Sequence, residues 1–278
     1  MLICFFAYIA VLSPWFPDRP HLKYQPVLIW AVVWALLSLV ARAEQTRFSE
    51  VAGMVRDWLP LILTLEAFHE MELFLPVRFE HRFEAAWIRW DHSLLGEWHG
   101  RTVIESLGRL IPFGLELSYL LVYAVGFFCV ALLYVQHRRV DIDRFLTVYL
   151  LGTLLAYALF PYFPSEPPRI VFPDVDRPLI TSWARTLNLW ILEVGTIHVG
   201  VFPSAHVSSA FSAAWGMLLV LPDQKIFGCG LFLYAVSVSV ATVYGRYHYA
   251  ADVLAGFAVS LVPGLVCLIL NKRQIDLP

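Results

Sequence analysis

Long apolar segments are the feature that most constrains how this chain can fold. A helix needs about 20 apolar residues to cross the hydrocarbon core of a bilayer. Seven segments are close to that length, and a shorter eighth stands at the start: 26–43, 58–75, 112–135, 145–161, 204–221, 226–243, 249–270 and 1–16. Only 15% of the 278 residues are charged, whereas about a quarter are charged in a soluble domain. The sequence therefore predicts an all-α fold, a polytopic transmembrane helical bundle of about seven to eight spans.

The composition argues against several other classes of protein. The segment 1–16 lacks the basic start and small-residue cleavage site of a signal peptide, so we interpret it as an uncleaved span. The formal net charge of −2 gives no indication of a nucleic-acid partner. The cysteines lie in apolar stretches, without the spacing of a zinc site or a disulfide framework: Cys4, Cys129, Cys229 and Cys267. We expect no metal and no other cofactor.

The chain divides into an N-terminal part and a helical core. We expect residues 1–100 to hold membrane spans and interfacial helices, and residues 101–278 to form the core. Trp87 and Trp98 are typical of an aromatic belt at the membrane interface. The segment 183–192 has an apolar and a polar face, and we expect it to lie in the interface as well.

Basic loops predict the orientation in the membrane, because short loops rich in Lys and Arg stay in the cytoplasm. The loop 136–144 is the most basic, and further basic residues lie within 42–56 and at 272–273. Placing all of them in the cytoplasm leaves the loops 80–111 and 162–202 outside, together with the turn before the last span.

Two histidines and an aspartate lie at the mouths of two predicted spans on this outer side. His248 and Asp252 are four residues apart, which places both side chains on one face of a helix. The carboxylate can hold one imidazole nitrogen and leave the other free as a nucleophile, base or metal ligand. His206 could then act as the complementary acid. Two alternatives stay open: histidines that only cap helix ends, and an iron or zinc site built from these three residues.

Three further residues point to a phosphate group beside these side chains. Arg169 follows two prolines that stiffen the exit of a span, and arginine offers phosphate a planar fork of donors. Ser204 is a natural N-cap, and the free amides and dipole of the helix that follows would attract an anion. Arg246 lies two residues before His248. The sequence therefore predicts phosphate ester chemistry at the outer membrane surface, with Arg169 and the helix N-terminus supplying the positive field.

Three motifs follow one another along the chain: Pro167-Pro168-Arg169, Pro203-Ser204-x-His206 and His248-x-x-x-Asp252. In order, spacing and membrane placement they resemble the motifs of the phosphatidic acid phosphatase type 2 superfamily, over about residues 110–270. The resemblance implies a six-helix catalytic core and an enzyme that acts on phosphorylated lipids at the extracytoplasmic face.

The resemblance also implies a role for each motif residue. His248 would be the nucleophile that forms a phosphohistidine, Asp252 would orient it, and His206 would protonate the leaving group. Arg169 and Ser204 would bind the phosphate, the serine partly through its backbone amide.

Departures from the phosphatase branch favour a different reaction. That branch has a lysine where this chain has Tyr162, a proline where it has Ile170, and an arginine where it has Thr242. We expect Arg246 to replace the last of these cations. The run from position 248 to 256 is more similar to the inositol phosphorylceramide synthase (aureobasidin-resistance, inositolphosphotransferase) branch, which transfers a phosphorylated headgroup between lipids.

We therefore expect a membrane phospholipid phosphotransferase with a phospholipid donor and an alcohol or water acceptor. The alternatives are a lipid phosphate or isoprenyl diphosphate phosphatase and, less favoured, a transporter. A transporter would carry ionisable groups at mid-membrane, whereas these cluster at the ends of spans. Short loops and few lysines favour a bacterial inner membrane, and nothing beyond the bilayer indicates a protein partner.

Other polar residues have open roles. Glu66, His69 and Glu70 lie in an otherwise apolar span, where they could hydrogen-bond the hydroxyls of a polyol headgroup. The alternative is that the span ends near Glu66 and the remainder lies in the interface. Asp91 and His92, near the outer surface, are expected to be solvated.

Overall fold

The chain is helical throughout the part that the computed structural model describes, residues 1–15, 24–74, 80–195 and 200–275. Within those ranges there are helices and turns but no strand. This confirms the all-α prediction, and each of the eight predicted apolar segments coincides largely with a helix.

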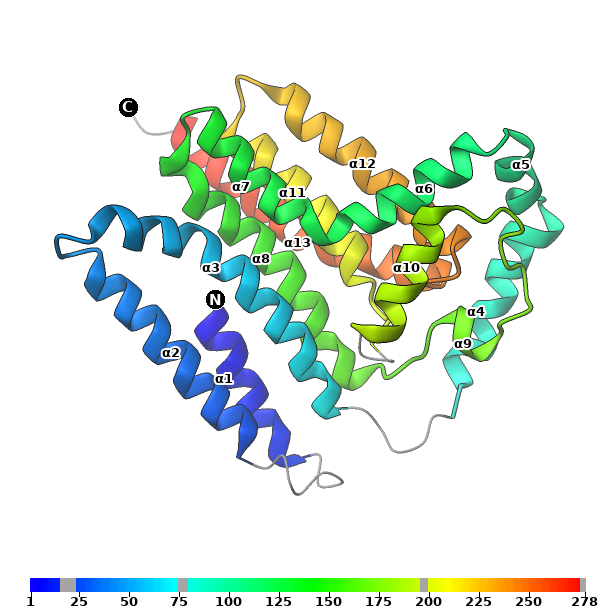
Figure 1. Cartoon of the computed structure of the whole chain (residues 1–278), viewed down its shortest axis with the longest axis horizontal. Helices are drawn as coiled ribbons and strands as arrows, with labels where there is room; N and C mark the ends of the chain where they lie inside the picture. The colour runs from blue at the N-terminus through cyan, green and yellow to red at the C-terminus, as the bar shows by residue number, and fades with distance from the viewer. Residues whose placement is uncertain (16–23, 75–79, 196–199, 276–278) are drawn as a thin grey trace.

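The core of the bundle occupies the middle of Figure 1 and consists of these helices: α6 (Leu110–Leu121), α7 (Val125–Val135), α8 (Ile142–Leu159), α11 (Ala205–Val220), α12 (Lys225–Tyr244) and α13 (Ala250–Ile275). One 3₁₀ turn joins α6 to α7, so the two form a single long apolar segment. α11 lies at the centre, where it packs against α8, α12 and α13.

Small side chains allow α11 to occupy this central position. Ser208, Ser212 and Ala213 are all fully buried. A Cβ atom at Gly152 of α8 would collide with Ser212, and Ser208 Oγ donates a hydrogen bond to the Gly152 carbonyl at 2.9 Å. Small residues let helix backbones approach closely in a bilayer, where packing drives helix association.

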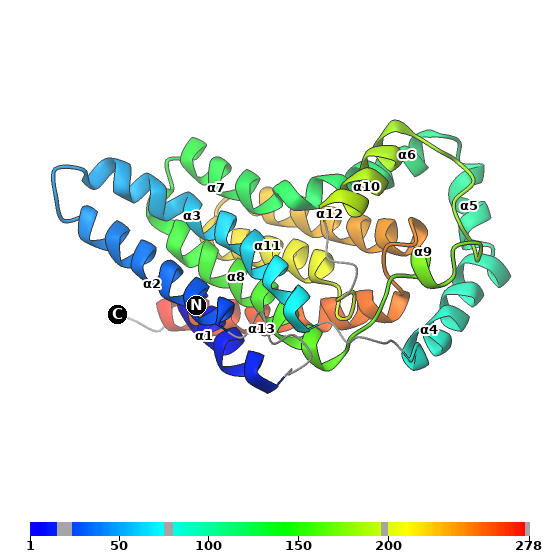
Figure 2. The ribbon, with the colours of Figure 1, turned by 60° about the horizontal axis from the view of Figure 1, so that its bottom comes forward.

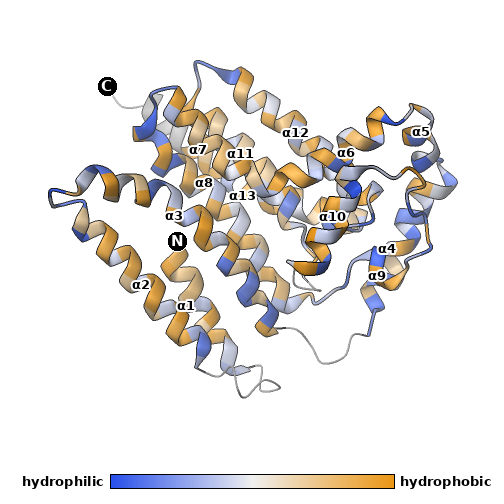
Figure 3. Cartoon of the chain, viewed as in Figure 1, coloured by the Kyte–Doolittle hydropathy of each residue, from blue (hydrophilic) through white to orange (hydrophobic). Residues whose placement is uncertain are grey.

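The first three helices form a group at one side of the molecule, on the left of Figures 1 and 2. They are α1 (Leu2–Leu12), α2 (Gln25–Ala43) and α3 (Ser49–His69), which pack on one another, and α3 also packs on α7 and α8. Large apolar side chains of α2 are exposed, among them Leu28, Trp34 and Leu39. Figure 3 shows how apolar residues dominate α1 and α2, as expected of helices that face lipid.

Shorter helices gather at one end of the bundle, toward the right of Figures 1 and 2: α4 (Arg82–His92), α5 (Gly100–Ser106), α9 (Pro168–Val171) and α10 (Trp183–Val194). α4 packs on α9 and α13, and α10 packs on α6. Ser182 caps α10, since its hydroxyl accepts from the Arg185 amide at 3.2 Å. α10 exposes Trp183 and Trp190, as the predicted interfacial segment requires. The predicted domain boundary at residue 100 stays a prediction.

Five helical segments of the described chain are long and apolar enough to cross a membrane: Gln25–Ala43, Leu110–Val135, Arg139–Tyr162, Lys225–Tyr244 and Ala250–Ile269. The sequence predicted seven to eight. The difference arises because α1 and α11, with 11 and 16 residues, are short. α3 is long enough but carries Arg56, Asp57 and Glu66. It begins at Ser49 and ends at His69, several residues earlier at both ends than the predicted span 58–75.

The basic loop and the predicted site lie at opposite ends of α11. Arg138 donates to the Val220 carbonyl at 2.8 Å, at the C-terminal end of this helix. Nearby, the fully buried Asp57 accepts from Arg139 Nε at 2.7 Å and from the Tyr134 hydroxyl at 2.6 Å. His206 lies at the other end, and a helix of 16 residues is roughly 24 Å long.

Candidate active site

The structure brings the two histidines and the aspartate together. His206 lies in the first turn of α11, His248 in the turn between α12 and α13, and Asp252 in the first turn of α13. His206 Nδ1 is 3.1 Å from His248 Nε2, and His248 Nδ1 is 3.4 Å from an Asp252 carboxylate oxygen. The predicted proximity of the three side chains is therefore present, and their chemical roles remain predictions.

A backbone carbonyl fixes which nitrogen of His248 carries the proton. His248 Nδ1 lies 2.9 Å from the Val201 carbonyl, which can only accept, so the hydrogen-bond network places the proton on Nδ1. Nε2 then presents its lone pair on the side of His206. Asp252 Oδ2 also accepts from the Tyr249 amide at 2.8 Å, while its second oxygen is buried and has no hydrogen-bond partner among the described residues.

Burial keeps His248 uncharged. Its exposed fraction is only 4%, and removal from water lowers the pKa of His248 well below its usual value. The neighbouring His206 and the Arg169 charge lower it further. A neutral imidazole whose Nε2 carries no proton is the form that can act as a nucleophile.

Ser204 ties the start of α11 to the start of α13. Its hydroxyl accepts from the Val207 amide at 3.4 Å, which confirms the predicted N-cap. Its own amide donates to the Asp252 carbonyl at 2.9 Å. That amide is therefore occupied in this structure, and the phosphate-binding role of Ser204 stays a prediction. A Cβ atom at Gly256 would collide with the Ser204 carbonyl oxygen, so this contact requires glycine.

Arg169 lies at the start of α9, directly after Pro167 and Pro168. Its amide donates to the Arg246 carbonyl at 3.1 Å, which holds the proline-rich loop against the His248 turn. Burial lowers the pKa of the Arg169 guanidinium, and no carboxylate in the described part of the chain pairs with it. Its charge therefore remains available to an anion.

Arg246 is almost fully buried and has a left-handed backbone conformation, with φ at 64°. Its Nη1 donates to Asp91 at 2.6 Å, while Nε and Nη2 are buried without a partner in the described chain. Asp91 was expected to be solvated, but it is fully buried because it pairs with this arginine. His92 is 55% exposed, as expected, and lies 2.8 Å from Asp176.

Aromatic rings that sequence reasoning missed surround His206. The ring centroids of Tyr119 and Tyr123 lie 5.0 and 5.3 Å from its imidazole. Tyr119 stacks on Tyr247 at 4.0 Å, and the Tyr247 hydroxyl donates to Glu116 at 2.6 Å. Tyr119 comes from α6, Tyr123 from the 3₁₀ turn that follows it, and Tyr247 from the His248 turn, and no motif includes Tyr119 or Tyr123.

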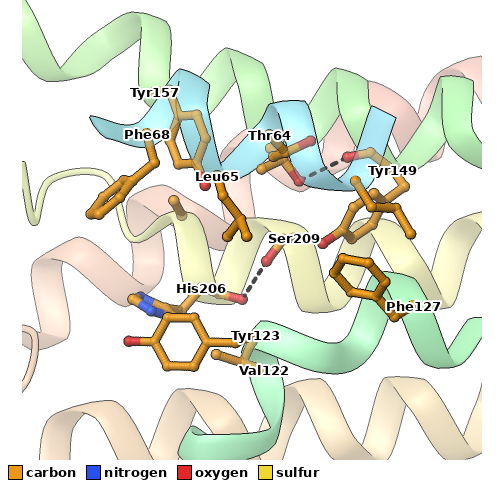
Figure 4. Close-up of a pocket in the computed structure, with 13 residues that line it drawn as sticks. Thr64, Leu65, Phe68, Val122, Tyr123, Phe127, Tyr149, Tyr157, His206 and Ser209 are labelled. Atoms are coloured by element: carbon orange, nitrogen blue, oxygen red, sulfur yellow. Dashed lines mark hydrogen bonds between the residues drawn. The ribbon is translucent and has the colours of Figure 1, made fainter. Parts of the chain in front are cut away.

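A mainly apolar cavity of about 80 Å³ lies beside His206, between α3, the α6–α7 segment, α8 and α11. Figure 4 shows Phe68 and Leu65 of α3 facing Tyr123 and His206 across it.

The three residues that the sequence offered as headgroup ligands do not line this cavity. Glu66 and His69 are exposed, and His69 Nδ1 lies 2.8 Å from the Leu65 carbonyl of its own helix. Glu70 is buried in the 3₁₀ turn that follows α3. Among the residues that the structure describes, no three His, Cys, Asp or Glu side chains form a group that could hold a metal ion, and this includes His206, His248 and Asp252.

The fold and these residues define an integral membrane protein of apolar helices with a histidine pair at one end of the bundle. Residues 85–266 match the PAP2 superfamily, the phosphatidic acid phosphatase type 2 superfamily that the motifs resemble. Since this match covers more than half of the chain, the chain belongs to that superfamily.

The chain is also similar to a PA-phosphatase related-family protein of Dictyostelium discoideum, with 26% identity over 184 residues. The match covers 56% of this chain and 32% of the relative, so it spans about a third of the relative's length. No solved structure matches the chain.

Proposed function

We propose that this protein is a membrane phosphotransferase that moves a phosphoryl or phosphoinositol-type group from a phospholipid to an alcohol through a phosphohistidine at His248. Superfamily membership supports an enzyme with phosphatase or phosphotransferase chemistry. The observation that carries the proposal is the histidine pair: His248 Nε2 faces His206 Nδ1 at 3.1 Å, while its other nitrogen is held by Val201.

In the first half of the reaction the lone pair of His248 Nε2 attacks the phosphorus atom. The bond from phosphorus to the leaving oxygen breaks, and His206, in its imidazolium form beside the bound anion, gives that oxygen its Nδ1 proton. The donor departs as an alcohol. The phosphorylated imidazole is positively charged, and the Asp252 carboxylate, whose Oδ2 lies 3.4 Å from His248 Nδ1, can stabilise this charge.

In the second half an acceptor hydroxyl attacks the phosphorus while neutral His206 takes its proton. The bond from phosphorus to Nε2 breaks, which returns His248 to its resting form and His206 to its imidazolium form. Arg169 and the two free nitrogens of Arg246 bind the phosphate oxygens in both halves. Ser204 holds the start of α11 in place, because its amide donates to the Asp252 carbonyl.

The phosphatase branch has a cation at each of two positions where this chain has Tyr162 and Thr242. The absence of these cations supports transfer to an alcohol rather than hydrolysis. Thr242 is fully buried, and its carbonyl accepts from the Tyr247 and His248 amides, so it shapes the turn. Tyr162 is exposed, and its hydroxyl contacts that of Tyr8 at 3.2 Å. Hydrolysis is the second candidate, because the Dictyostelium relative is named as related to a phosphatase of phosphatidic acid.

The proposal places the site at the extracytoplasmic face of a bacterial inner membrane. The separation of His206 from the basic loop at the far end of α11 supports this orientation, since basic loops favour the cytoplasm.

Product analysis by mass spectrometry tests this proposal. The purified protein in detergent receives dioctanoyl phosphatidylinositol or dioctanoyl phosphatidic acid, with and without inositol and a lipid alcohol. A phosphorylated product that requires the acceptor is expected, and it is expected to be absent with His248→Ala. Free phosphate with no dependence on acceptor would favour the phosphatase, and full activity of His248→Ala would contradict the mechanism. Turnover in the presence of a strong chelator is expected to stay unchanged.

A further inference from the structure

A buried carboxylate from α4 binds both sides of the turn that carries His248. Asp91 Oδ2 accepts from Arg246 Nη1 at 2.6 Å, and Asp91 Oδ1 accepts from the Ala250 amide at 2.9 Å. Arg246 and Ala250 lie two residues before and two residues after His248. One side chain therefore spans the turn from the end of α12 to the start of α13.

The ion pair between Asp91 and Arg246 is almost fully desolvated. The side chains of Asp91 and Arg246 are 0% and 2% exposed. Removing one partner of a buried ion pair leaves an uncompensated charge, which is strongly unfavourable. Arg246 also has a positive φ of 64°, a conformation that a residue other than glycine keeps only where surrounding contacts hold it. The turn is thus held in place by Asp91.

We propose that Asp91 is a positioning residue, which sets the place of His248 opposite His206 and keeps the free nitrogens of Arg246 available to the phosphate. The proposal rests on the function proposed above. Asp91 does not touch the reacting atoms. It acts through Arg246 and Ala250, and it lies 155 positions before Arg246, outside the three motifs.

The kinetic test compares two buried aspartates that both pair with arginine. Asp91→Asn keeps an oxygen that accepts from the Ala250 amide, but it replaces the carboxylate charge that pairs with Arg246 by a neutral amide. Asp57→Asn disturbs the pair of an equally buried aspartate with the partly exposed Arg139, at the other end of the bundle. Since small displacements of reacting groups cost up to about 100-fold in rate, we expect Asp91→Asn to lower kcat by about 10- to 100-fold. Asp57→Asn is expected to stay within about threefold of the unaltered protein. Equal losses in the two variants, or a loss below threefold in Asp91→Asn, would overturn the proposal.

A chemical readout that needs no turnover tests the position of His248 directly. Diethyl pyrocarbonate modifies accessible neutral histidines, and peptide mass spectrometry locates each modified residue. We expect the buried His248 to react at least threefold faster in Asp91→Asn than in Asp57→Asn, while the exposed His92 reacts equally in both. An unchanged rate at His248 would overturn the proposal.

A second variant covers the case in which Asp91→Asn does not fold. Ala250→Pro removes the amide hydrogen that donates to Asp91 and sets the proline ring against the carboxylate, at the first position of α13, where proline is tolerated in the helix. The loss of one hydrogen bond is expected to lower kcat by about threefold to tenfold, and no loss would overturn the proposal.

The labelling result also separates this inference from the proposed function. If the unaltered protein turned over neither phospholipid, the proposed function would fail, while faster labelling of His248 in Asp91→Asn would still support the positioning role.

Discussion

Gly256 offers a sharp test of how the site is held together. The residue lies in α13 where a Cβ atom would collide with the Ser204 carbonyl oxygen and would lie 3.3 Å from the Ser204 Cβ. Gly256→Ala therefore pushes the N-cap of α11 away from α13 and stretches the 2.9 Å bond between the Ser204 amide and the Asp252 carbonyl. His206, two residues further along, moves with the N-cap.

The matched control is Gly230→Ala in α12, where a Cβ atom would meet nothing within 4 Å. Alanine is favoured over glycine in an open helical position by about 1 kcal/mol, so Gly230→Ala is expected to stabilise the protein slightly. Overpacking costs about 1–3 kcal/mol. Because both variants gain the same helix propensity, Gly256→Ala is expected to be less stable than the control by about 1–3 kcal/mol. A displaced His206 is expected to lower kcat by at least tenfold.

The assay is unfolding in detergent, followed by tryptophan fluorescence, together with the acceptor-dependent product measurement. Both variants replace one helical glycine by alanine, so differences between them report the contact with Ser204. If Gly256→Ala were as stable and as active as Gly230→Ala, the close approach of α13 to Ser204 would not exist as described.

Three further predictions concern the catalytic pair and its surroundings. His248→Ala is expected to abolish turnover, whereas His206→Ala is expected to slow formation of the phosphoenzyme more than its breakdown; rapid-quench kinetics measure both steps. The pKa of His248 is lower in the folded protein than in the unfolded chain, so as pH falls the unfolded chain takes up a proton at a higher pH than the folded protein does. The free energy of unfolding should therefore fall as pH drops below about 6.5. The same scan with His248→Gln should lose that part of the slope, and identical slopes would contradict the buried neutral imidazole. Tyr247→Phe removes a hydrogen bond to the buried carboxylate of Glu116 and should destabilise the fold by about 1.5–3 kcal/mol in thermal unfolding, whereas Tyr162→Phe, at an exposed hydroxyl, should leave stability unchanged.

Features that depend on local patterns in the sequence, such as apolar segments and motif spacing, could be predicted from the sequence alone. Apolar length predicted the positions of the helices. The spacing of His248 and Asp252 predicted two side chains on one helix face; they do meet, at 3.4 Å, but His248 lies in the turn before α13 and not on that helix. Motif order predicted that His206 meets them, which the 3.1 Å contact between the imidazoles confirms.

Contacts between distant parts of the chain could not be predicted from these patterns. Val201 holds His248 through a backbone carbonyl, which carries no side-chain signal. Asp91 resembles any polar residue of an amphipathic helix until α4 is placed against the His248 turn. The extent of α3 was misjudged because charged residues such as Asp57 are neutralised by partners from α7 and the adjoining loop, which hydropathy does not register.

The central claim is that His248 becomes phosphorylated, and trapping that species tests it most directly. The protein would be mixed with dioctanoyl phosphatidylinositol or phosphatidic acid without acceptor, quenched in alkali, in which phosphohistidine survives, digested, and analysed by mass spectrometry. The account predicts a phosphorus adduct on Nε2 of His248 in the unaltered protein, which is phosphate from phosphatidic acid or phosphoinositol from phosphatidylinositol. It also predicts the loss of this adduct on addition of the acceptor, and none with His248→Ala. Phosphate on another residue, or turnover without any phosphorylated His248, would contradict it.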